Sequence, residues 1–118
     1  MNPAKLIALL LSVCLVGGIV YGMLFTELGV FFGGYRFWMG LAAYSDFPEL
    51  RSESVQRVLN GTQYGVDQAE SWVLAHGDRT RRIRLWKILI ERAPNEGWRS
   101  RYSDHLQREQ AESTRHQP

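Results

Sequence analysis

The chain has 118 residues, a formal net charge of +2 and a hydrophobic fraction of 45%. This length leaves room for one membrane segment and a domain of about seventy residues, which is near the lower limit for a self-sufficient core. The net charge is too small to indicate nucleic acid as the primary ligand. With Cys14 as its single cysteine, the chain cannot form an intrachain disulfide.

The first apolar segment is Leu6 to Phe25, which contains no charged residue. A helix of this length, at about 1.5 Å per residue, matches a hydrocarbon core of about 30 Å. We therefore predict that residues 1–27 form an N-terminal transmembrane anchor in the cell membrane, specifically a bacterial inner membrane. A cleaved signal peptide, with Lys5 as its charged region, is the alternative. The apolar residues that follow the candidate cleavage point after Gly22 favour the anchor.

Glycines in the hydrophobic half are spaced for close helix packing. Gly18 and Gly22 form a G-x-x-x-G pair, which lets another helix approach closely. Gly29 and Gly33 repeat this spacing in the next apolar segment. We predict a helix-packing face at these four glycines, and the alternative is that glycine is common in membrane helices.

The second apolar segment, residues 28–44, combines glycines, aromatic residues and one arginine. On a helix, the glycines and Arg36 fall on one side, while most aromatic residues, including Trp38, fall on the other and are expected to face lipid or the membrane interface. Arg36 is costly at the bilayer centre, and the connector Thr26-Glu27 is too short for a comfortable hairpin. Residues 28–45 are therefore predicted to form an interfacial helix. A re-entrant helix that pairs Arg36 with a partner's carboxylate remains an alternative.

Residues 46–110 carry the signals of short antiparallel helices, which makes the predicted fold all-α. Four helices are expected, namely Asp46 to Leu59, Asp67 to Gly77, Arg79 to Ala93 and Asn95 to Gln110. Capping boxes, an acid followed by glutamate three residues later, open the first two at Asp46 and Asp67. The third has the clearest periodicity, with Trp86 at the centre of its apolar arc. Residues 111–118 are expected to form a flexible tail.

The sequence carries no pattern typical of catalysis, a metal site or a cofactor site. The histidines His76, His105 and His116 do not share metal-ligand spacing. There is no nucleophile elbow or glycine-rich phosphate loop. Asp67 and Glu70 are better explained as helix caps than as an acid and a base. We therefore expect a protein that is not an enzyme and has no cofactor or small-molecule substrate.

A basic run lies in the third predicted helix, where six cations occur between Arg79 and Arg92. Three interpretations compete: a solvated helix face, a surface for anionic lipid, and a surface for an acidic protein or nucleic acid. The residues predicted to contact a partner or lipid are Arg36, Trp38, Arg81, Arg82, Arg84 and Lys87.

Two classes of function fit this organisation. The first is a membrane-anchored adaptor or accessory subunit that binds a membrane protein partner through its helical domain. The second is a small membrane-active or membrane-sensing protein, of the toxin, immunity or lysis type, that acts through the hydrophobic half in the lipid bilayer. Three capped helices bearing Trp72, Trp86 and Trp98 would be of little use to the second class, so we favour the adaptor.

Overall fold

The computed structural model describes residues 2–115, and all regular secondary structure within them is helical. The elements in chain order are α1 Pro3–Phe25, α2 Glu27–Gly29, the π-helical turn η1 Val30–Gly34, α3 Tyr35–Tyr44, α4 Pro48–Gly61, α5 Gly65–Ala75, α6 Arg79–Arg92 and α7 Glu96–Arg115. The all-α prediction is thus confirmed for this part of the chain. α7 continues beyond the predicted end at Gln110, so part of the predicted flexible tail is helical. Residues 116–118 lie outside the described residues.

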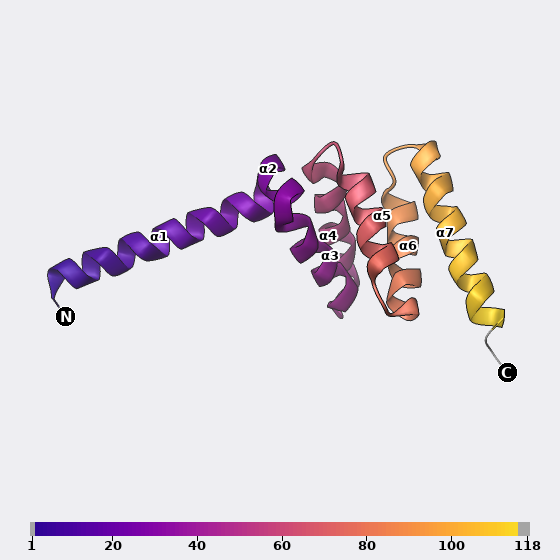
Figure 1. Cartoon of the computed structure of the whole chain (residues 1–118), viewed down its shortest axis with the longest axis horizontal. Coiled ribbons are helices and arrows are strands. Elements are labelled where there is room, and N and C mark those ends of the chain that lie inside the picture. Colours follow the sequence, from indigo (N-terminus) through magenta and orange to yellow (C-terminus); the bar gives the residue numbers. More distant parts are fainter. Residues whose placement is uncertain (1, 116–118) are drawn as a thin grey trace.

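α1 is a single rod that projects from the rest of the molecule (Figure 1). The side chain of Asn2 accepts a hydrogen bond from the Ala4 N–H and begins the helix. None of the residues of α1 is buried, although the helix is long and apolar enough to cross a membrane. A signal sequence would also have this length and composition. Such an apolar surface is unfavourable in contact with water.

α1 and α2 meet at a sharp corner formed by Thr26. Its backbone is extended, its N–H donates to the Gly22 carbonyl and ends α1, and its Oγ1 accepts from the Gly29 N–H at 3.1 Å. The same residue therefore caps both helices, and no loop separates them. The chain then continues through η1 into α3, so α3 begins close to the end of α1.

α3 to α6 pack against one another, and α7 packs on α6. Figure 1 shows them side by side, with α3 and α4 nearest to α1, then α5 and α6, and finally α7 at the far end. Fully buried side chains from five helices form the core, and the largest include Met39, Val55, Val73, Trp86 and Tyr102. We call α3 to α7 the bundle.

The first two helices of the predicted domain begin at other residues than the capping boxes indicated. α4 begins at Pro48 without a side-chain cap, because Phe47 at the N-cap position has no side-chain acceptor, and Ser45 Oγ accepts the Phe47 N–H in the preceding turn. α5 begins at Gly65, before Asp67. A Cβ at Gly65 would lie 2.0 Å from the Val58 carbonyl oxygen, so this close contact with α4 requires glycine.

The caps of the last two helices are confirmed. Asp78 Oδ1 accepts the Thr80 N–H at 3.0 Å at the start of α6. Asn95 Oδ1 accepts the Trp98 N–H at 3.0 Å at the start of α7. Both caps satisfy backbone donors that have no partner within the helix.

Candidate functional site

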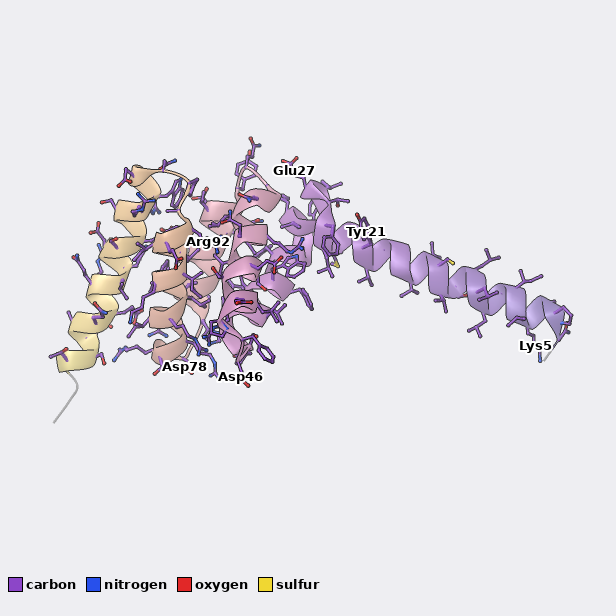
Figure 2. All side chains as sticks on the ribbon, turned by 180° about the vertical axis from the view of Figure 1, so that it is seen from behind. Lys5, Tyr21, Glu27, Asp46, Asp78 and Arg92 are labelled. Atoms are coloured by element: carbon purple, nitrogen blue, oxygen red, sulfur yellow. The ribbon has the colours of Figure 1, made fainter. Side chains whose placement is uncertain are left out.

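The corner between α1 and α3 is the first candidate site, because it joins the candidate membrane span to the bundle. Figure 2 shows Glu27 at this corner, with Tyr21 on the adjoining part of α1 and Lys5 towards its other end. Two glycines make the corner possible. A Cβ at Gly29 would lie 2.0 Å from the Gly22 carbonyl oxygen, and a Cβ at Gly34 would lie 2.0 Å from the Met23 carbonyl oxygen. Backbone therefore packs directly on backbone here.

The predicted packing glycines divide into two groups. Gly29 packs against the backbone of Gly22, and a Cβ at Gly33 would lie 2.9 Å from the Met23 side chain. A Cβ at Gly18 or at Gly22 would meet nothing within 4 Å. Gly34, which has the same role as Gly29, is absent from the predicted packing residues. The Gly33-Gly34 doublet was the available signal, but spacing alone does not show which glycine faces the neighbouring helix.

Trp38 connects the two sides of the corner. Its Nε1–H donates to the Leu24 carbonyl at 2.9 Å, in the last turn of α1, where carbonyls have no partner within the helix. Its ring lies edge-on to Phe25 at 5.7 Å and to Phe37 at 5.2 Å, and Phe25 stacks with Tyr21 at 5.0 Å. We call Tyr21, Phe25, Trp38 and Phe37 the aromatic row.

The prediction that the side of the second segment bearing Trp38 faces lipid or the membrane interface is wrong, because this side is buried in the bundle. Trp38 is 8% exposed, and Met39 and Ala42 are fully buried in the bundle. This side of α3 packs against α4 to α6, whose apolar side chains cover it. The segment by itself does not indicate these neighbours. The exposed side of α3 instead carries Arg36 and Phe37.

Arg57 of α4 lies over the aromatic row, a contact that the sequence did not reveal. Its guanidinium carbon is 5.0 Å from the ring centroids of both Phe25 and Trp38. The nearest carboxylate, Glu53, is 3.7 Å away on the same helix, and the Arg57 side chain is exposed. A cation over two rings adds about 0.5–1 kcal/mol per contact at an exposed site. Arg57 and Phe25 are too far apart in the sequence for local patterns to relate them.

A hollow of about 350 Å³ lies between the end of α1 and α4. It is lined by Leu24, Phe25, Val30, Glu53, Gln56, Arg57, Asn60 and Gly61. The residues from α1 and η1 are apolar, whereas α4 supplies polar and charged groups. The hollow thus joins an apolar wall to a polar one at the end of the candidate span.

Arg36, near the start of α3, is exposed. Its Nε–H donates to the Tyr35 hydroxyl at 3.3 Å, and this hydrogen bond raises the pKa of Arg36. The structure gives it no carboxylate partner among residues 2–115. Its guanidinium therefore remains available to an external anion.

The basic run of α6 is mostly engaged within the bundle. Arg82 makes a two-pronged pair with Glu109 of α7, at 2.8 and 3.1 Å, and Glu109 raises the pKa of Arg82. Arg84 donates to the Ala43 carbonyl at 2.8 Å, at the end of α3. These partners come from other helices, so the periodicity of α6 could not indicate them.

The remaining predicted contact residues of α6 differ from each other. Arg81 pairs with Asp78 at 2.6 Å, and its guanidinium carbon lies 4.5 Å from the Tyr44 ring centroid. Lys87 is exposed, and no ion pair involves it among the described residues. Among the predicted contact residues of α6, Lys87 is therefore the one that makes no ion pair or side-chain hydrogen bond within residues 2–115.

Glu70 is buried and ion-paired, whereas the sequence indicated a helix cap. Glu70 is 6% exposed, and its carboxylate accepts hydrogen bonds from the Arg101 guanidinium at 2.5 and 2.8 Å. His105 Nε2 lies 3.1 Å from the same carboxylate. The His105 ring stacks on Trp86 at 4.5 Å. Both carboxylate oxygens are occupied, so this cluster holds α7 against α5. Residues 2–115 contain no group of three or more side chains placed to hold a metal ion.

Tyr102 gives the bundle a pH dependence. Its hydroxyl donates to the Val66 carbonyl at 2.9 Å, and burial, aided by the charges of Glu70 and Asp67, raises its pKa. In the unfolded chain the phenol ionises near about pH 10, whereas in the folded chain it stays neutral. The contribution of Tyr102 to the free energy of unfolding is therefore fully present below about pH 10. It falls as the pH rises above this value, by up to about 1.4 kcal/mol per pH unit.

We expect Tyr102→Phe to remove this alkaline loss of stability, as measured by thermal melting between about pH 8 and about pH 11. Tyr64→Phe is the matched control because the Tyr64 side chain is exposed. Equal alkaline slopes for Tyr102→Phe and wild type would show that another group causes the dependence.

A second exposed apolar surface lies at the other end of the bundle. The His76 ring stacks on Trp72 at 5.0 Å and lies edge-on to Tyr44 at 5.6 Å. Phe47, close to Tyr44 in the chain, is exposed, as is Tyr44 itself. We call Tyr44, Phe47, Trp72 and His76 the distal patch. Large exposed apolar side chains in such a group are typical of a protein contact surface.

Comparisons with protein-family models, with curated proteins and with solved structures give no significant match for this chain.

Proposed function

We propose that the protein is a membrane-anchored adaptor or accessory subunit of a larger membrane complex. α1 crosses the cell membrane, specifically a bacterial inner membrane, and the bundle binds a protein partner. The observation that carries this proposal is that α1, a candidate membrane span, is connected directly to the bundle. An apolar helix with no buried residue is joined at Thr26, without a loop, to helices that have a core of their own.

The distal patch supports a protein partner. It lies at the opposite end of α3 from the corner, so α1 does not cover it. Tyr, Trp and Phe side chains are enriched in protein interfaces, where they bury much area at low entropic cost. The partner we propose is another membrane protein, because the anchor keeps the patch near the bilayer.

The alternative function is a membrane-active or membrane-sensing protein that acts through α1. The fully exposed apolar surface of α1 and the open glycine Gly18 would suit it. This function leaves the bundle core and the distal patch without a purpose, and we therefore favour the adaptor. We propose no enzymatic role, since the carboxylate of Glu70, the best candidate for acid or base chemistry, is occupied by Arg101.

The adaptor proposal predicts that the full chain stays in the membrane pellet after a carbonate wash. It also predicts that a protein co-purifies with it in mild detergent. The double variant Tyr44→Asp/Phe47→Asp should lower recovery of that protein at least about tenfold, because charge in an apolar contact costs more than about 1.4 kcal/mol. Gln107→Asp, on the exposed side of α7, is the control and should have no effect.

Three outcomes would contradict parts of this proposal. Recovery of a shortened chain in the soluble fraction would show that α1 is a signal peptide. The absence of any co-purifying protein would contradict the adaptor function. Equal recovery with wild type and the double variant would move the contact surface away from the distal patch.

A further inference from the structure

We propose that the exposed face of α3 and α4 beside the corner lies on the bilayer surface, with Arg36 and Arg57 at the depth of the phospholipid phosphates. We call this the bilayer face, and it comprises Arg36 and Phe37 of α3 and Arg57 and Asn60 of α4. The bundle then has a single orientation relative to the membrane. This inference rests on the proposed function, because it requires α1 to span the bilayer.

The first argument is that the corner leaves no linker on which the bundle could swing. Thr26 is the one residue between α1 and α2, and both helices use it as a cap. Gly29 and Gly34 hold η1 directly against the backbone of Gly22 and Met23. The Trp38 indole adds a hydrogen bond to the Leu24 carbonyl. The direction of α1 therefore sets the direction of α3.

The second argument is the arrangement of the helices. α1 leaves from the α3 and α4 side of the bundle and runs across the axes of its helices, and α7 is the helix farthest from it (Figure 1). When α1 crosses a bilayer, the helices of the bundle therefore lie along the membrane surface. α3 and α4 are nearest to the lipid, and α7 is the most distant.

The third argument is the continuity of the aromatic row across the corner. Tyr21 and Phe25 belong to the end of α1, while Phe37 lies on the exposed side of α3 and is linked to them through Trp38. Tyrosine and tryptophan side chains gather at the level of the lipid headgroups, where their rings meet both apolar and polar surroundings. Tyr21 and Trp38 place such side chains on both sides of the corner.

The fourth argument is charge. Arg36 has no carboxylate partner among the described residues, and Arg57 has only the weak contact with Glu53. The planar guanidinium group forms two-pronged hydrogen bonds with phosphate. The hollow beside Arg57 has an apolar wall from α1 and a polar wall from α4, which matches the transition from acyl chain to headgroup. A phospholipid headgroup is therefore the occupant we propose.

A fluorescence experiment on the full chain tests the orientation. Cys14→Ser removes the native cysteine, and single cysteines then replace Phe37, Leu74 or Gln107 and carry an environment-sensitive dye. Phe37 and Leu74 are matched in exposure, at 52% and 53%, but lie on α3 and α5. In vesicles of phosphatidylcholine and phosphatidylglycerol containing a headgroup-labelled quencher lipid, we expect at least about threefold stronger quenching at position 37 than at 74 or 107.

Equal quenching at positions 37 and 74, in a chain that resists carbonate extraction, would overturn the orientation and leave the anchor proposal intact. Release of the chain by carbonate would overturn both. Weaker quenching at 37 than at 74 would show that the opposite side of the bundle faces the lipid.

The headgroup contact is tested with Arg57→Gln, and Arg108→Gln on α7 is the matched control. Phosphatidylglycerol should increase the quenching at position 37 above that in vesicles of phosphatidylcholine alone. We expect Arg57→Gln to lower this increase at least about twofold and Arg108→Gln to leave it unchanged. An equal loss of quenching in both kinds of vesicle would show that Arg57 only supports the packing of the corner, and would overturn the headgroup contact.

Discussion

Replacing Trp86 with alanine is expected to unfold the bundle while α1 remains helical. The Trp86 side chain is completely buried and stacks on His105, with the Tyr102 ring 5.9 Å away. Removing a buried tryptophan costs about 3–5 kcal/mol, which approaches the total stability of a domain of this size, roughly 4–12 kcal/mol. Thermal melting of the full chain in detergent, followed by circular dichroism, should show the transition lowered or lost.

Two controls separate lost packing from other effects. Trp86→Phe keeps most of the ring volume, and Trp86 Nε1 has no hydrogen-bond partner to lose, so this variant should melt well above Trp86→Ala. Leu74→Ala removes an exposed side chain and should melt as wild type. An unchanged melting curve for Trp86→Ala would exclude Trp86 from the core.

Replacing Gly34 with alanine is expected to open the corner between α1 and α3. The added Cβ would lie 2.0 Å from the Met23 carbonyl oxygen, and the two backbones must separate to admit it. Such overpacking costs about 1–3 kcal/mol or more. Gly40→Ala is the matched control, since a Cβ there meets nothing within 4 Å. It should be neutral or should stabilise the helix by up to about 1 kcal/mol.

Spin-label distances measure the opening directly. The native Cys14 on α1 and an Arg108→Cys substitution on α7 are both exposed and provide the two labelling sites. Gly34→Ala should shift or broaden the distance distribution, and Gly40→Ala should preserve it. If both variants give the distance distribution of the parent protein, the corner tolerates a side chain at position 34. The backbone contact between Gly34 and Met23 would then not be what fixes the angle between α1 and α3.

Local sequence signals were sufficient for α1 and α6. The absence of charge from Leu6 to Phe25 predicts the long apolar helix, because only side-chain chemistry along one segment is involved. For α6, the apolar periodicity and the cap at Asp78 lie within the helix itself, and Leu85, Trp86 and Leu89 are buried. Catalytic, cofactor and partner predictions stay predictions.

Tertiary structure decided which side of each helix is used. Trp38 faces the core because α4 to α6 cover that side of α3, and Arg82 is neutralised by Glu109, which lies on α7. Glu70 resembles a cap in sequence but pairs with Arg101 across the interface between α5 and α7. Periodicity shows that a helix has two sides, whereas only the neighbouring helices determine which of them is buried.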